Sequence, residues 1–267
     1  MVNFIHKDRY DVDDLVQIMK LLRSEDGCPW DREQTHQSIR QNFIEETYEV
    51  CEAIDNQDVA LLREELGDVL LQVVFHSQME EERGTFDLHD VADEICKKLI
   101  LRHPHVFGEV QADTSAEVLT NWDEIKRKSK GHSTHTAAMD SVARSLPALM
   151  RAEKIQSKAR NVGFDWADYT GAEAKLLEEL GELKSADEAH RLEEAGDFLF
   201  AAVNVVRLFG INPELALSRA SDKFLRRFGA VERAAAAQGK RLEEMTLSEM
   251  DELWDEVKRI EGVEGER

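Results

Sequence analysis

The chain has 267 residues, of which 42% are hydrophobic and 33% are charged, so it is no disordered tail and can form one large domain or two smaller ones. Its formal net charge of -21 argues against a nucleic-acid-binding protein, because such proteins present a basic face to phosphate. A polyanionic substrate would meet the same repulsion unless metal cations accompanied it.

Helical periodicity runs through most of the sequence, and no run of alternating β-branched residues predicts a strand. Before the middle of the chain, helices are expected over 12–23, 38–56, 59–82, 88–102 and 115–128. A polar run of small residues at 130–136 then predicts a linker. After it, helices are expected over 145–160, 168–186, 189–209, 213–237 and 247–260. Thr114 with Glu117, and Thr246 with Glu249, have the spacing of capping boxes.

An internal repeat is the most informative feature of the sequence. Its first copy contains the acidic residues Glu45, Glu46, Glu49, Glu64, Glu65 and Asp68. Its second copy contains Glu178, Glu179, Glu182, Glu193, Glu194 and Asp197. A basic pair at i and i+4 follows each copy, namely Lys98 with Arg102 and Lys223 with Arg227. The interval between the two acidic motifs is shorter in the second copy, which predicts a shorter connection between its helices.

The acidic residues of each motif share one face of a helix, because they lie three positions apart. Glu65 and Asp68 belong to a helix that is apolar nearly all round, so they should be buried. Carboxylates that converge between packed helices repel one another unless divalent cations join them. An all-oxygen ligand set favours Mg²⁺, with Mn²⁺ as a substitute. The basic pairs could then bind phosphates.

Alone, an acidic pair with this spacing is more often a solvent-exposed helix face than a site. The ordered repetition in an apolar context favours a site.

Nearly the whole chain resembles the MazG family of nucleoside triphosphate pyrophosphohydrolases in its tandem two-domain form. The resemblance rests on the acidic motifs and on the segments GCPWD at 27–31, RHPHVF at 102–107 and NVGFDW at 161–166. The resemblance implies an all-α fold with helix bundles completed by a homodimer. It also implies Mg²⁺-dependent hydrolysis of NTPs or dNTPs to monophosphate and pyrophosphate, which serves to clean the nucleotide pool.

Carried over by position, the resemblance implies metal ligands at Glu179, Glu182, Glu194 and Asp197. The implied catalytic residues are Glu178, Glu179, Lys223 and Arg227. The implied nucleotide-binding residues are Lys175, Glu178, Glu193, Asn204, Lys223, Arg227 and Trp254. The first copy supplies a second candidate site from Glu45, Glu46, Glu49, Glu65, Asp68, Lys98 and Arg102. The resemblance implies that the second copy is the active one. Asn204 favours the same copy, because it stands on the metal-facing stripe where the first copy has Phe75.

The resulting domain organisation is an N-terminal domain over 1–129, a linker over 130–144 and a C-terminal domain over 145–267.

The three cysteines are not in CxxC pairs, which predicts free thiols and a reducing cytosol. No signal peptide and no apolar run of 18 residues is seen, so a soluble cytoplasmic protein is expected.

Two other functions remain open. The chain could be a nucleotide-sensing or partner-binding helical module in which the acidic residues hold a structural Mg²⁺. It could also be a related all-α hydrolase that prefers dUTP or a phosphoribosyl compound. Base and sugar preference cannot be read from the sequence.

Overall fold

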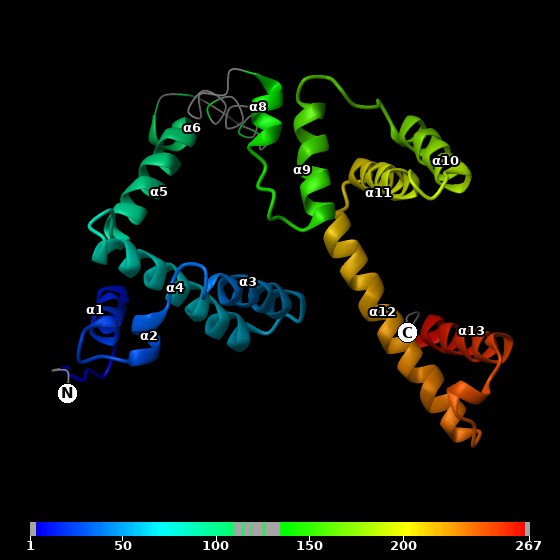
Figure 1. Ribbon diagram of the computed structural model, residues 1–267, viewed down its shortest axis with the longest axis horizontal. Helices are drawn as coiled ribbons and strands as arrows, with labels where there is room; N and C mark the ends of the chain where they lie inside the picture. The colour runs from blue at the N-terminus through cyan, green and yellow to red at the C-terminus, as the bar shows by residue number, and fades with distance from the viewer. Residues whose placement is uncertain are drawn as a thin grey trace. The chain divides into compact units, whose positions relative to one another are not determined.

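The computed structural model describes residues 4–108 and 134–264, together with the single positions 110, 114, 118 and 125. Over these residues the chain forms helices and no strand, which confirms the all-α expectation. The chain divides into two compact units, Met1–Ser129 and Lys130–Arg267, and each is considered by itself (Figure 1). The limits of the linker remain a prediction.

The helices of the first unit are α1 (Val12–Arg23), α2 (Pro29–Glu33), α3 (Arg40–Asp55), α4 (Val59–Glu82), α5 (Leu88–Arg102) and α6 (Pro104–Phe107). Those of the second unit are α8 (His135–Asp140), α9 (Ala148–Arg160), α10 (Tyr169–Ser185), α11 (Arg191–Leu208), α12 (Pro213–Ala237), the 3₁₀ turn η1 (Leu242–Glu244) and α13 (Leu247–Glu264). The helix expected over 115–128 and its cap fall almost entirely outside the described residues.

Local sequence signals explain where several helices begin. Pro213 occupies the first turn of α12, where its missing N–H is not needed. The predicted capping box of α13 is confirmed: the backbone N–H of Thr246 donates to Glu249 at 2.9 Å, and that of Glu249 donates to Thr246 Oγ1 at 3.3 Å. The segment predicted as a linker contains the short helix α8, because the Thr134 side chain caps its first turn. Short segments such as α2, α6 and η1 carry too few residues for periodicity to reveal them.

In each unit, two consecutive helices carry the acidic motifs and pack together: α3 with α4, and α10 with α11. The prediction of a shorter connection in the second copy was wrong. Only residues 56–58 join α3 to α4, whereas residues 186–190 join α10 to α11. The second interval is shorter because α10 ends soon after Glu182 and α11 begins just before Glu194.

The core of the first unit holds the acidic helix pair in place. Its buried residues are Val16, Met19, Ile39, Val74, Phe75 and Met79. Residues 70 to 79 of α4 pack on α1 and on Ile39 at the start of α3, so this core lies beyond Glu65 along α4. In the second unit, Val231 and Ala235 of α12 pack on Leu253 of α13.

Across the described residues, no single helix has the length and apolar character to cross a membrane. The pair α11 and α12, bent by 100° at the break between them, meets that test of length and composition only when taken together.

Candidate active site

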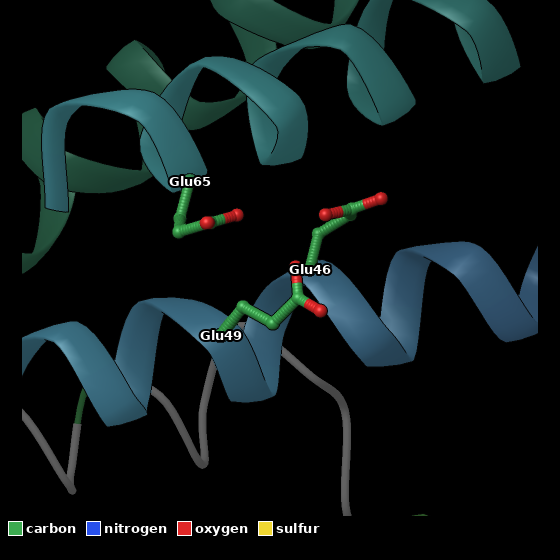
Figure 2. Close-up of side chains that lie close together, drawn as sticks. All are labelled: Glu46, Glu49 and Glu65. Carbon is green, nitrogen blue, oxygen red and sulfur yellow. The ribbon is translucent and has the colours of Figure 1, made fainter. Parts of the chain in front are cut away.

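The first acidic cluster lies between α3 and α4. Glu46 and Glu49 project from α3, and Glu65 projects from α4 toward them (Figure 2). One carboxylate oxygen from each of these three residues lies within 4.8 Å of the other two. Glu65 is buried and Glu46 is half-buried. The expected convergence of acidic side chains between two packed helices is therefore present.

The second acidic cluster repeats this arrangement between α10 and α11. Glu179 and Glu182 come from α10 and Glu194 comes from the first turn of α11, again with one oxygen each within 4.8 Å of the others. Glu179 is buried, with 6% of its surface exposed. The i, i+3 spacing directs both side chains of α10 to α11, as the sequence indicates.

Burial and mutual repulsion perturb these carboxylates. Desolvation raises the pKa of Glu46 and Glu65, and the neighbouring negative charges raise both further. In the second cluster, desolvation and the charge of Glu179 raise the pKa of Glu182, and Lys175 partly opposes this. Carboxylates with raised pKa that gather between two helices are typical of functional sites.

The donor chemistry fits a divalent cation. Three carboxylates from two helices supply only oxygen, which suits Mg²⁺ or Mn²⁺ better than Zn²⁺. A cation between the helices would replace the repulsion with attraction, while leaving positions for water and substrate oxygens.

A lysine accompanies the second cluster. Nζ of Lys175 lies 2.7 Å from Oε1 of Glu178 and 2.7 Å from Oε1 of Glu179. Its hydrogen bonds to these two carboxylates raise the pKa of Lys175, so the ammonium form is held firmly. Two of the residues expected to bind nucleotide, Lys175 and Glu178, therefore lie beside the acidic cluster.

The fourth metal ligand expected in each copy is not part of the close group. Asp68 is near enough to raise the pKa of Glu46 through its charge, but it is not among the three oxygens within 4.8 Å. Asp197 lies one turn beyond Glu194 on α11 and is exposed, as is Glu193. Glu45 is also exposed, and it accepts a hydrogen bond from Gln41 at 3.3 Å.

The basic pairs lie on other helices. Lys98 and Arg102 belong to α5, and within the described ranges neither forms an ion pair with the first cluster. On α12, Arg227 donates to Glu261 at 2.7 Å and stands 5.9 Å from the ring centroid of Trp254, whereas Lys223 is exposed. Arg227 and Trp254, both expected to contact nucleotide, are therefore neighbours.

Within the second unit, α11 separates the acidic cluster from the basic pair. Glu194 lies in its first turn, and α12 begins only after its end and turns away by 100° (Figure 1). The 18 residues of α11 span about 27 Å at 1.5 Å per residue. The structure does not bring Lys223, Arg227 and Trp254 onto the acidic cluster of the same chain.

Asn204 is buried and already engaged. Its Oδ1 accepts a hydrogen bond from Nε of Arg207 at 3.0 Å, and Arg207 also donates to Asp165 at 2.6 Å. The Arg207–Asp165 pair, with side chains only 6% and 10% exposed, joins α11 to the loop before α10. Sequence reasoning missed this pair, although an arginine on the otherwise apolar face of α11 was a usable signal.

A pocket of about 300 Å³ lies elsewhere in the first unit, between α1, α4 and the start of α5. Its lining includes Gln17, Lys20, Ser77 and Gln78 but none of the clustered acidic residues. This pocket is therefore separate from the acidic clusters.

Comparison with known proteins links these clusters to one family. Residues 34–107, which include α3, α4 and the first cluster, match the model of the MazG nucleotide pyrophosphohydrolase domain. The chain is 47% identical over 257 residues to the nucleoside triphosphate pyrophosphohydrolase of Escherichia coli K12, covering 94% of this chain and 98% of that protein.

Two further relatives agree. The identity is 45% over 247 residues to the nucleoside triphosphate pyrophosphohydrolase/pyrophosphatase MazG of Thermotoga maritima, covering 92% of this chain and 95% of that protein. It is 47% over 249 residues to the uncharacterized protein YabN of Bacillus subtilis, covering 91% of this chain and 51% of that protein. Because the likeness spans both acidic helix pairs at this identity, the chain belongs to the MazG family.

Proposed function

We propose that this chain hydrolyses nucleoside triphosphates to the monophosphate and pyrophosphate, using Mg²⁺ held by the second acidic cluster. The observation that carries the proposal is the convergence of Glu179, Glu182 and Glu194 from two helices, with raised pKa at Glu182. Family membership and the names of the relatives support the same reaction. Mn²⁺ is expected to substitute, since it accepts the same oxygen ligands.

In this mechanism Glu179, Glu182 and Glu194 would hold the cation, with Asp197 as the additional ligand one turn further on. When bound, the cation would neutralise charge on the phosphate oxygens during the reaction. Glu178 accepts a hydrogen bond from the attacking water, orients it and takes its proton. The water oxygen forms a bond to a phosphorus as the bond from that phosphorus to the bridging oxygen breaks, which separates the monophosphate from pyrophosphate.

We also propose that the molecule is a homodimer whose partner supplies the basic side chains. Lys223 and Arg227 lie far along α12 from the acidic cluster of their own chain, so a second chain would have to bring them to it. A stripe of exposed apolar side chains, including Leu217, Phe224 and Leu225, runs along α12 beside the basic pair. Burying this stripe against another copy would remove apolar surface from water and close the open site.

The remaining nucleotide contacts follow from the same arrangement. Trp254 offers an aromatic face beside Arg227, so a base and the phosphates could be bound by neighbouring groups. Lys175 and Glu193 flank the acidic cluster, and the amide of Asn204 would contact the sugar if Arg207 shifted. Lys98 and Arg102 would play the role of the basic pair for the first cluster.

The cellular setting is proposed from chemistry alone. Cys28, Cys51 and Cys96 are free thiols, which suits the cytoplasm. The strong negative charge argues against nucleic-acid partners. Removal of unwanted nucleotides is the role that agrees with membership of the MazG family.

Product analysis tests the reaction. The full-length protein is incubated with Mg²⁺ and a panel of NTPs, dNTPs and dUTP, and pyrophosphate and orthophosphate are measured separately. Equimolar monophosphate and pyrophosphate are expected, and their formation should stop with EDTA. Orthophosphate as the first product would contradict the proposal. Tight nucleotide binding without turnover would instead indicate a nucleotide-sensing module.

A further inference from the structure

The two acidic clusters differ at one position that lies directly beside the metal-binding carboxylates. Lys175 stands four residues before Glu179, and Asn42 stands four residues before Glu46. Positions i and i+4 of a helix are neighbours on one face. In each cluster this position therefore lets a side chain on the same helix reach the equivalent glutamate, Glu179 or Glu46.

Lys175 uses this position to place a cation on the second cluster. Its Nζ lies 2.7 Å from a carboxylate oxygen of Glu179, which is one of the three clustered acidic residues, and 2.7 Å from Glu178. The Glu179 side chain is only 8% exposed, whereas that of Lys175 is 39% exposed. The ammonium thus covers the buried carboxylate from the solvent side, and its long flexible stem leaves it able to move away.

The first cluster has no such cation. In the described part of the chain, no lysine or arginine lies within 4.0 Å of a carboxylate oxygen of Glu46, Glu49 or Glu65. Asn42 carries no charge. The negative potential of the first cluster is consequently available to a free divalent ion, while that of the second is partly neutralised from within.

An ammonium and a divalent ion compete for the same carboxylate charge. A metal ion that enters the second cluster must displace Lys175 or bind beside its positive charge, and both weaken the affinity for the free ion. A bound triphosphate restores the affinity of the second cluster for the metal ion, because it offers the displaced ammonium of Lys175 new anionic oxygens. Metal binding and triphosphate binding then favour each other, and this coupling is reciprocal.

We propose that Lys175 is a built-in counter-cation that makes the second cluster bind a divalent ion together with a triphosphate, whereas the first cluster binds the free ion more tightly. This inference rests on the proposed function of the second cluster. The difference between Lys175 and Asn42 thus assigns the two copies different tasks. The first copy retains a metal ion, and the second copy binds the metal ion together with the substrate.

The test measures Mn²⁺ binding to the full chain by the electron paramagnetic resonance signal of free Mn²⁺. Glu46→Gln with Glu49→Gln leaves only the second cluster, and Glu179→Gln with Glu182→Gln leaves only the first. The first cluster should bind Mn²⁺ about two- to fivefold more tightly, the range expected for one partly exposed charge. Lys175→Met should tighten the second cluster by a similar factor, and Asn42→Lys should weaken the first.

Two controls isolate the position of the charge from its presence. Lys175→Arg keeps a cation at the site and should leave the affinity for Mn²⁺ nearly unchanged. Lys184→Met removes one positive charge from an exposed position on the same helix, so it should not tighten Mn²⁺ binding to the second cluster.

The coupling to substrate is tested with a non-hydrolysable triphosphate analogue. The analogue should tighten Mn²⁺ binding to the second cluster, and Lys175→Met should reduce that gain.

Equal affinities of the two clusters, or an unchanged affinity after Lys175→Met, would overturn the inference while leaving pyrophosphate release by the parent chain intact. Absence of pyrophosphate release would instead overturn the proposed function. The two failures are therefore read from different measurements.

Discussion

The equivalent glutamates Glu179 and Glu46 allow the two sites to be compared residue for residue. Glu179→Gln keeps the volume of the side chain but removes one charge from the second cluster. Because even outer-shell partners of metal ligands contribute roughly 10–100-fold, the rate of pyrophosphate release should fall by more than about 100-fold. The matched Glu46→Gln should retain most of the activity. Steady-state kinetics decide the assignment, and the opposite pattern would place turnover in the first copy.

Asp165 and Arg207 form the most deeply buried ion pair of the second unit among the described residues. Removal of one partner from such a pair leaves an uncompensated charge, so Asp165→Ala should lower the free energy of unfolding by roughly 3–5 kcal/mol. Urea denaturation measures this. Asp255→Ala, which breaks the exposed pair with Lys258, is the control and should cost at most about 1 kcal/mol. Equal effects of the two variants would contradict the structural role of the pair.

At the scale of elements, the like charges of the first acidic cluster oppose the packing of α3 on α4 unless a cation is present. Burial raises the pKa of Glu46 and Glu65 above the ordinary 4.5, so the folded chain binds more protons than the unfolded chain as these groups titrate. The free energy of unfolding attributable to them therefore falls as pH rises through that window. Below pH 4.5 these carboxyl groups are protonated in both the folded and the unfolded chain, so the free energy of unfolding is not reduced by them.

Thermal unfolding tests this sign. In EDTA, Glu46→Gln should raise the Tm at pH 7.5 and leave it nearly unchanged near pH 4. In Mn²⁺ at pH 7.5 the parent chain should have the higher Tm, because it gains the binding energy of the ion while Glu46→Gln has lost a ligand. A variant that is less stable in EDTA at pH 7.5 would show that the cluster is not repulsive.

For the whole molecule, the separation of the acidic and basic residues along one chain predicts association. Light scattering should give a mass near twice 30.5 kDa. Leu225→Glu, which places a charge on an apolar side chain that is 68% exposed, should shift the mass toward that of one chain and reduce activity. The exposed substitution Arg241→Glu, away from this stripe, should do neither.

Mixing inactive variants tests whether sites are shared between chains. Glu179→Gln lacks a metal ligand and Arg227→Met lacks a phosphate-binding group, so each should be inactive alone. If acidic and basic residues come from different chains, exchange of subunits should restore one intact site in a mixed dimer. Activity that stays absent after complete exchange would mean that every site is built within one chain.

The sequence alone determined the helical class, most helix bounds and the pairing of acidic motifs, because each is encoded by spacing within a few turns. Convergence of Glu46, Glu49 and Glu65 followed from i, i+3 geometry and an apolar helix. The i, i+4 spacing likewise places Lys175 beside Glu179 on one helix. Only tertiary structure decided the ion pair of Arg207 with Asp165, which lie 42 residues apart, and the separation of Arg227 from the acidic cluster. Both depend on how helices and loops are arranged in space, which local periodicity does not encode.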